Sequence, residues 1–271
     1  MPDESREAKW RKKLAPYYEE LGLDKGAVVD GASRAAFNLE AAEAIAEFKP
    51  EVVSFHFGLP APGLLTRVRA WGAKIISSAT TVEEARWLKA RGVDVIIAQG
   101  WEAGGHRGIF LSDDLTSQVG TFALLPQIAK AVRVPVIAAG GIADAKGVAA
   151  AMKLGAAGVQ IGTAYLLCAE CTISPLHRAA LKSELAQHTA VTNVFTGRPA
   201  RGIPNRLMRE LGPIDPEAPA FPIAYSAVAP LRAKAEGIGS SDFSPLWSGQ
   251  NVTGCKEIPA ADLTRELAVG L

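Results

Sequence analysis

The sequence has little that points to a nucleic acid or a membrane. Its 271 residues include 29 basic and 28 acidic residues, and the net charge is only +1. No basic face is therefore predicted for a nucleic acid, and we expect a small or neutral partner. No run reaches the roughly 18 apolar residues of a membrane span, and residues 1–22 lack the apolar core of a secretory signal. These absences favour a cytoplasmic protein.

Cysteine is scarce, and one common nucleotide motif is missing. Three cysteines, an odd number in a chain of this length, do not predict a disulfide framework. Cys168 and Cys171 form a C-x-x-C pair, but no second pair or nearby His-x-His accompanies it. We interpret both as ordinary small side chains and predict no metal site. The lack of a G-x-G-x-x-G motif with a downstream acid argues against a Rossmann dinucleotide site.

What the sequence has in abundance is an alternation of apolar runs with helix-like segments. This alternation predicts one large α/β domain with a parallel sheet. The runs are rich in Val and Ile, and each predicts a strand: EVVSFHFG (51–58), AKIISSA (73–79), VDVIIAQG (93–100), VPVIAAGG (134–141) and AGVQIGTAYL (157–166). Thr81 with Glu84, and Asp144, predict helix N-termini between these strands. The longer interval 100–135 predicts an extended loop followed by a helix near 120–132.

The segments outside the predicted sheet are mostly helical. Before the first strand we expect a helix over 3–21, a turn-rich connector over 22–36 and a helix over 39–48 capped by Asn38. After the last strand we expect a helix near 175–187, a loop over 192–206, helical segments and then a loose tail from Gly237 onward. Nothing before the first strand predicts a further strand of a buried parallel sheet.

Glycines gather where three of the predicted strands end. One strand leads into the run EAGGHRG (102–108), the next ends in Gly140-Gly141, and the last ends in Gln160-Ile161-Gly162-Thr163. The carboxyl ends of parallel barrel strands carry the reacting groups, and glycines there let backbone N–H groups approach an anion closely. Each doublet alone would also fit an ordinary tight turn. Together, on sequential strands, they predict a phosphate site.

His106 is the candidate catalytic residue. It lies in the glycine-rich loop after a strand, where an imidazole can take a proton from an activated carbon. The alternative is a surface histidine held by a backbone hydrogen bond. His56, between two phenylalanines, either lines the site or is a satisfied core histidine, and both interpretations stay open. His177 and His188 lie in helical segments and are interpreted as structural or solvated.

The motifs resemble those of a known family. VVSFHFG, ISSATTVEEARWL, IAQGWEAGGHRG, VPVIAAGGIAD, GVQIGTAYL and FTGRPARG occur in the order and spacing found in FMN-dependent nitronate monooxygenases, formerly called 2-nitropropane dioxygenases. The resemblance covers about residues 8–249. It implies a TIM-type (β/α) barrel flavoenzyme that oxidises alkyl nitronates with O2 to a carbonyl compound and nitrite.

The resemblance also assigns roles to residues. It implies that Gln99 and Gly104 contact the flavin and that Gly141 holds its phosphate end, together with Gln160, Ile161, Gly162 and Thr163. His106 is implied to be the catalytic base, needed for neutral nitroalkanes more than for preformed nitronates. Arg198 and Arg201, in the loop over 192–206, are candidates for covering the site or binding an anionic group, with a solvated surface loop as the alternative. Tyr165 and Asn205 are weaker candidates for the same lining.

The sequence departs from the family pattern at its N-terminal side. A strand ending in a Q-A-P-M-A-G-like motif, a glycine-rich second strand and a third strand with an N-V-N-F-like run are absent. We therefore expect an incomplete barrel of five of eight strands, corresponding to strands four to eight, and a misassigned start at Met1. Such an array has open edges, so our hypothesis is that the chain binds FMN weakly unless another chain covers the open side. We expect residues 1–249 to form this partial barrel with helical and lid segments, and residues 250–271 to form a tail.

Two other functions stay open at this point. One is a different FMN barrel, such as an NAD(P)H-dependent enoyl or quinone reductase. The other, from another class, is a non-catalytic truncated remnant. The expected partners of the first interpretation are a nitronate or nitroalkane and O2, and a homo-oligomer is left open.

Overall fold

A computed structural model describes residues 3–24, 26 and 36–270. The chain separates into two compact units, which we describe one at a time. Unit 1 comprises residues 1–34, 104–106 and 166–257, and unit 2 comprises residues 35–103, 107–165 and 258–271. Most of the predicted connector over 22–36 lies outside the described residues.

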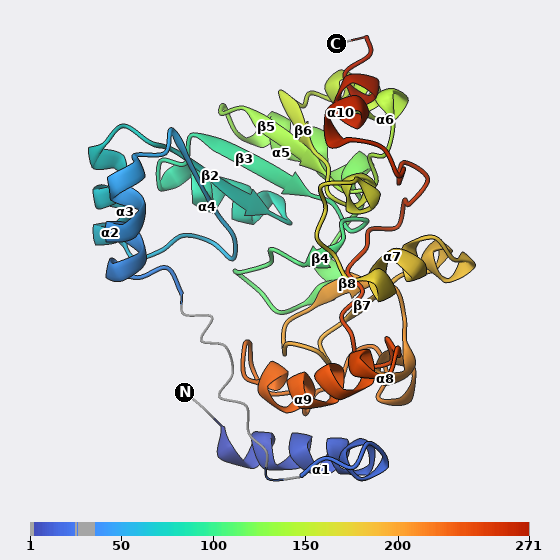
Figure 1. Cartoon of the computed structure of the whole chain (residues 1–271). Helices are drawn as coiled ribbons and strands as arrows, with labels where there is room; N and C mark the ends of the chain where they lie inside the picture. The colour runs from blue at the N-terminus through green and yellow to red at the C-terminus, as the bar shows by residue number, and fades with distance from the viewer. Residues whose placement is uncertain (1–2, 25, 27–35, 271) are drawn as a thin grey trace. The chain divides into compact units, whose positions relative to one another are not determined.

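Unit 2 is built on a parallel sheet of five strands in the order β1-β2-β3-β5-β6. Figure 1 labels β2, β3, β5 and β6 of this sheet, coloured from teal to yellow-green. The strands are β1 (Val52–Phe55), β2 (Lys74–Ala79), β3 (Val95–Gln99), β5 (Val136–Ala139) and β6 (Gly158–Gln160). Each lies inside one of the five predicted runs. The prediction of five parallel strands is therefore confirmed.

Helices accompany the strands of unit 2, and some of them begin where an N-cap residue predicts them. They are α2 (Leu39–Phe48), α3 (Pro62–Ala70), α4 (Val82–Ala90), α5 (Thr121–Ala131), α6 (Ala145–Lys153) and α10 (Ala260–Leu267), with a short 3-10 helix η1 (Leu115–Ser117). The side chains of Asn38, Thr81 and Asp144 each accept a backbone N–H in the first turn of their helix. Buried aliphatic side chains of β2, β3, α4 and α5 form the core, which fixes the strand ends relative to one another.

Unit 1 combines helices with a small antiparallel sheet. Its helices are α1 (Glu4–Glu20), α7 (Pro175–Leu181), α8 (Arg206–Glu210) and α9 (Ala224–Gly237), with the 3-10 helix η3 (Glu184–Gln187). A further 3-10 helix, η2 (Thr163–Leu167), follows β6. The sheet has the order β4-β8-β7, with β4 (Gly105–His106), β7 (Ala190–Thr192) and β8 (Ala200–Gly202). Trp10 and Leu14 of α1 share a buried cluster with Val228 and Leu231 of α9.

Two predicted segments need correction. The loop over 192–206 contains β8 and begins at the end of β7. These two short strands pair with each other, and β8 also pairs with β4. The expected loose tail contains α10, whose Leu263 and Leu267 are buried. The spacing of these two leucines is helical, so the signal was present in the sequence. The helix over 175–187 is present as α7 followed by η3. The boundary at 249 remains a prediction.

Among the described residues, no helix combines the length and the apolar character that crossing a membrane requires.

Candidate active site

His106 lies in unit 1, on the two-residue strand β4. Its backbone pairs with Ala200 of β8, and its Nε2 lies 2.9 Å from the hydroxyl oxygen of Thr196. The ring of Phe221 meets the imidazole edge-on at a centroid distance of 5.4 Å, and Trp247 lies at 5.5 Å. The imidazole is half-buried. It is therefore held by one hydroxyl and two aromatic rings, with part of its surface still accessible.

Sequence reasoning missed all three of these neighbours. Thr196 is 90 residues from His106 along the chain, and the two aromatic residues are farther still. Thr196 does fall within the motif FTGRPARG, which is the one signal that could have singled it out. Phe221 and Trp247 lie in segments that the sequence marked only as helical or loose.

Gly104 has a packing role in unit 1. A Cβ built on it would lie 2.5 Å from the backbone nitrogen of Gly249 and 2.6 Å from the carbonyl carbon of Ser248. Both contacts are with backbone atoms, which cannot move aside cheaply. The glycine is thus required by close backbone packing, and its predicted contact with a flavin remains a separate prediction.

Gln99 ends β3 in unit 2 and is buried. Its Oε1 accepts a hydrogen bond of 2.7 Å from the backbone N–H of Gly108. The side chain therefore fixes the backbone two residues after His106. Its predicted flavin contact is not tested by this geometry.

The predicted phosphate-binding glycines lie at the ends of β5 and β6 in unit 2. Gly140 and Gly141 have φ angles of +116° and +75°, a region that favours glycine. Gly162 is exposed, and a Cβ built on it would meet nothing within 4 Å. Gln160 is exposed and Thr163 begins η2. This open backbone leaves room for an anion, so the residues fit the phosphate of a cofactor.

One carboxylate lies close to these glycines. A Cβ on Gly141 would lie 3.5 Å from the Cβ of Glu102. The carboxylate of Glu102 accepts hydrogen bonds from the backbone N–H and the hydroxyl of Thr121, at the first residue of α5. Its negative charge is therefore held by the partial positive charge of a helix N-terminus.

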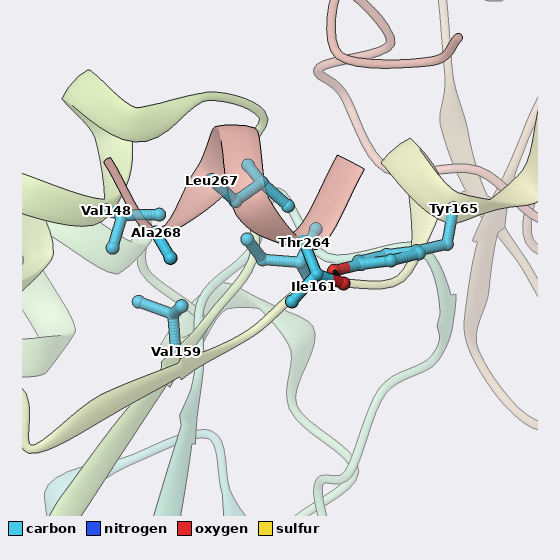
Figure 2. A pocket seen from close by; sticks show the side chains of 7 residues that line it. All are labelled: Val148, Val159, Ile161, Tyr165, Thr264, Leu267 and Ala268. Carbon is cyan, nitrogen blue, oxygen red and sulfur yellow. Dashed lines mark hydrogen bonds between the residues drawn. The ribbon is translucent and has the colours of Figure 1, made fainter. Parts of the chain in front are cut away.

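Figure 2 shows an apolar pocket of about 330 Å³ beside the end of β6. Its lining comes from α6, β6, η2 and α10 and from residues directly beside them: Val148, Val159, Ile161, Tyr165, Thr264, Leu267 and Ala268. The Tyr165 hydroxyl lies 2.8 Å from the hydroxyl of Thr264 at one end of the pocket. Because the side chain of Ile161 lines this pocket, any contact of Ile161 with a phosphate has to come from its backbone.

The candidate residues Arg201, Asn205 and His177 are buried and form hydrogen bonds within the protein. Arg201 is buried and donates to the backbone and hydroxyl oxygens of Thr189, so the suggestion that it binds an anionic group is not supported. Asn205 is also buried and caps α8. His177 is buried, and its Nε2 lies 3.1 Å from the backbone oxygen of Trp247, which supports the structural interpretation.

His56 is exposed, which excludes the interpretation as a core histidine. Its Nδ1 lies 3.1 Å from the hydroxyl of Ser78, beyond the end of β1. A Cβ built on Gly108 would lie 2.9 Å from the His56 ring, so the two residues pack closely. His56 therefore borders the loop that follows His106.

A parallel sheet with helices between its strands and open glycines at its strand ends is typical of one class of protein, the α/β-barrel enzymes that bind a phosphate-bearing cofactor. The nitronate monooxygenase family model matches residues 2–270. The chain belongs to this family, whose members are TIM-barrel oxidoreductases that use FMN.

Individual relatives agree with this assignment. The chain is 41% identical to the nitronate monooxygenase of Paraburkholderia phytofirmans, over 98% of this chain and 73% of the relative. It is 39% identical to that of Pseudomonas aeruginosa, over 98% and 76%. The nitroalkane oxidase structure from Streptomyces ansochromogenes matches with a TM-score of 0.89 and 36% identity, over 99% of this chain and 77% of that one. FabK from Thermotoga maritima matches less well, with a TM-score of 0.68 and 28% identity over 87% and 72%.

Proposed function

We propose that this chain is a nitronate monooxygenase that converts alkyl nitronates and O2 to a carbonyl compound and nitrite. The family membership supports the reaction, and the surroundings of His106 support a proton-transfer step within it. A small-molecule substrate and O2 are the proposed partners, with no nucleic acid or membrane, and the cytoplasm is the proposed location.

The proposed cofactor contacts follow the strand ends. Gly141 and the run from Gln160 to Thr163 would hold the phosphate of FMN through their backbone, and Gln99 and Gly104 would lie nearer the ring. When bound, FMN supplies the electron transfer between the nitronate and O2. The role of the chain is to orient the substrate and to handle its proton.

His106 is the proposed base. A neutral nitroalkane has to lose the proton on the carbon beside its nitro group before it becomes a nitronate, and a neutral imidazole can accept that proton. Once protonated, both ring nitrogens carry hydrogen, so Nε2–H can donate to the Thr196 hydroxyl oxygen 2.9 Å away. The position of this hydroxyl is the single observation that carries the proposal, because it stabilises and orients the protonated ring.

Two measurements test the proposed function. The protein is first mixed with FMN, and the absorbance of bound flavin is read after removal of free cofactor. Nitrite release and O2 uptake are then followed with a preformed alkyl nitronate, without any nicotinamide cofactor. The proposal predicts nitrite under these conditions. Reduction of an enoyl thioester or a quinone by NAD(P)H, without nitrite from the nitronate, would assign the chain to a different group of FMN barrels.

A further inference from the structure

The chain passes from unit 1 to unit 2 between His106 and Arg107. Arg107 is fully buried, although arginine is among the side chains that folding buries least often. Its Nη1 donates to the backbone oxygen of Gly100 at 2.7 Å, and its Nη2 donates to that of Gln99 at 2.9 Å. The guanidinium therefore fixes the residue next to His106 to the carboxyl end of β3.

A second buried charge holds the far end of the same loop. Glu84 of α4 is only 1% exposed. Its Oε1 accepts hydrogen bonds from the backbone N–H groups of Phe110 at 2.6 Å and Leu111 at 3.3 Å. Its Oε2 accepts from the backbone N–H and the hydroxyl of Thr80. The Glu84 carboxylate thus accepts four hydrogen bonds from protein groups. It holds the loop in place at Phe110, three residues beyond Arg107.

The neutral side chains of Gln118 and Thr80 connect Arg107 to Glu84 through hydrogen bonds. We call this hydrogen-bonded chain of four side chains the relay. Arg107 donates to Oε1 of Gln118 through Nη2 at 3.0 Å and through Nε at 3.2 Å. The amide nitrogen of Gln118 donates to the Thr80 hydroxyl at 2.9 Å, and that hydroxyl donates to Glu84 at 2.7 Å.

The direction of the relay is consistent at every step. The Thr80 hydroxyl has one hydrogen, and giving it to Glu84 leaves a lone pair that accepts from Gln118. The amide orientation that this requires also presents its oxygen to Arg107. Each dipole therefore points from the buried cation toward the buried anion, and such networks polarise and strengthen their members in a low-dielectric interior.

We propose that Arg107 and Glu84, joined by Gln118 and Thr80, are positioning residues that hold the backbone after His106 in the geometry its proton transfer requires. This inference rests on the proposed function, in which His106 removes the proton of a neutral nitroalkane. The relay acts through His106. Its loss affects the nitroalkane step more than the oxidation of a preformed nitronate.

The test breaks the relay at its neutral centre, so that neither buried charge is removed. Gln118→Leu is compared with Gln127→Leu, a change at an exposed position on α5. Because small displacements of a catalytic group cost large factors in rate, we expect kcat with a neutral nitroalkane to fall about tenfold or more in Gln118→Leu, and kcat with the nitronate to change by less than about twofold. Gln127→Leu is expected to match the wild type on both substrates.

Thr80→Val and Thr80→Ser form a second pair that keeps the test decisive if Gln118→Leu does not fold. The valine removes the hydroxyl at the centre of the relay with little change of shape, and the serine keeps it. We expect the nitroalkane defect in Thr80→Val and its rescue in Thr80→Ser. If Thr80 only filled space, Thr80→Val would keep the nitroalkane activity and Thr80→Ser would not restore anything.

A spectroscopic measurement reports on the same geometry without activity. In protein labelled with ¹⁵N-histidine, the imidazole signals of His106 are assigned by their loss in His106→Asn. We expect these signals to shift in Gln118→Leu and to stay unchanged in Gln127→Leu. Unchanged His106 signals in a folded Gln118→Leu, or an equal loss of kcat on both substrates, would overturn the inference. Absence of nitrite from the wild type with either substrate would instead refute the proposed function, and the spectra would still report on the relay.

Discussion

The two sides of the peptide bond between His106 and Arg107 are held in different ways. On the unit 1 side, the half-buried imidazole has a hydrogen bond to a hydroxyl and contacts with two aromatic rings. On the unit 2 side, the guanidinium is fully buried and forms hydrogen bonds to two carbonyl groups and an amide. A base has to keep access to its substrate, whereas the backbone that carries it gains from being fixed. In the structure, a buried and hydrogen-bonded guanidinium lies beside the candidate base, and the base itself keeps accessible surface.

The largest effect is expected from removing the buried anion of the rigid side. Glu84→Ala leaves the backbone N–H groups of Phe110 and Leu111 without their acceptor and Arg107 without the far end of its relay. Breaking a buried charge network of this kind costs about 3–5 kcal/mol of unfolding free energy. Urea denaturation would measure it, with the exposed neighbour Glu83→Ala as the control. A cost as small as that of the control would show that the buried carboxylate of Glu84 does not stabilise the loop after Arg107.

Gly104→Ala tests the backbone that leads into His106 on the unit 1 side. The added Cβ would overlap the backbone at Ser248 and Gly249, so we expect a loss of about 1–3 kcal/mol in unfolding free energy. Gly63→Ala on α3, where a Cβ meets nothing within 4 Å, is the matched control and is expected to be neutral or slightly stabilising. If Gly104→Ala keeps full stability and loses only flavin binding, the packing explanation is wrong.

Thr196→Val removes the hydroxyl that holds the imidazole. We expect kcat with a neutral nitroalkane to fall by up to about tenfold, because the protonated ring loses an acceptor worth about 1 kcal/mol. Activity with a preformed nitronate should change little. Steady-state kinetics on both substrates provide the measurement, and Thr196→Ser, which retains the hydroxyl, should restore the nitroalkane activity. If Thr196→Ser does not restore the nitroalkane activity, the Thr196 hydroxyl does not support proton transfer by His106.

The smallest effect concerns His177, the buried histidine that contacts the backbone oxygen of Trp247. Burial holds the pKa of His177 below its ordinary value of 6.5, and the charge of Arg232 acts in the same direction. The unfolded chain therefore binds a proton more readily than the folded chain. The corresponding stability is fully present above pH 6.5 and is lost as the pH falls through the folded pKa.

His177→Gln removes this titration. We expect the melting temperature to fall less between about pH 7.5 and about pH 5.5 in His177→Gln than in the wild type. His188→Gln, at an exposed position, is the control. If the melting temperature depends on pH in the same way in the wild type and in His177→Gln, protonation of His177 does not contribute to the loss of stability in acid.

The strands and the first helices were predictable because their signals are local. Buried parallel strands are continuous Val- and Ile-rich runs, and Asn38, Thr81 and Asp144 mark helix starts through side chains that cap the following turn. The short strands β7 and β8 carry no such pattern. These strands form because they pair with each other and because β8 pairs with β4. A short stretch of sequence contains no sign of such pairing.

The candidate site was predictable in part for the same reason. His106 and the glycines were visible as a loop after a strand and as doublets at strand ends. The hydroxyl of Thr196, the rings of Phe221 and Trp247 and the relay from Arg107 to Glu84 depend on tertiary contacts between distant segments. The role of the Glu84 side chain differs from the one that its spacing predicts. Its spacing from Thr81 predicts a capping box, and the Thr81 hydroxyl does accept the backbone N–H of Glu84. The carboxylate of Glu84, however, accepts hydrogen bonds from Thr80 and from the loop at Phe110.

The measurement that tests the central claim most directly is the activity of FMN-loaded His106→Asn on two forms of one substrate. A neutral nitroalkane needs its proton removed, and the corresponding nitronate has already lost it. We predict that kcat with the nitroalkane falls by about 100-fold or more, the usual contribution of a general base, while nitrite release from the nitronate stays within about tenfold of the wild type. An equal loss on both forms, with flavin still bound, would contradict the assignment of His106 as the base.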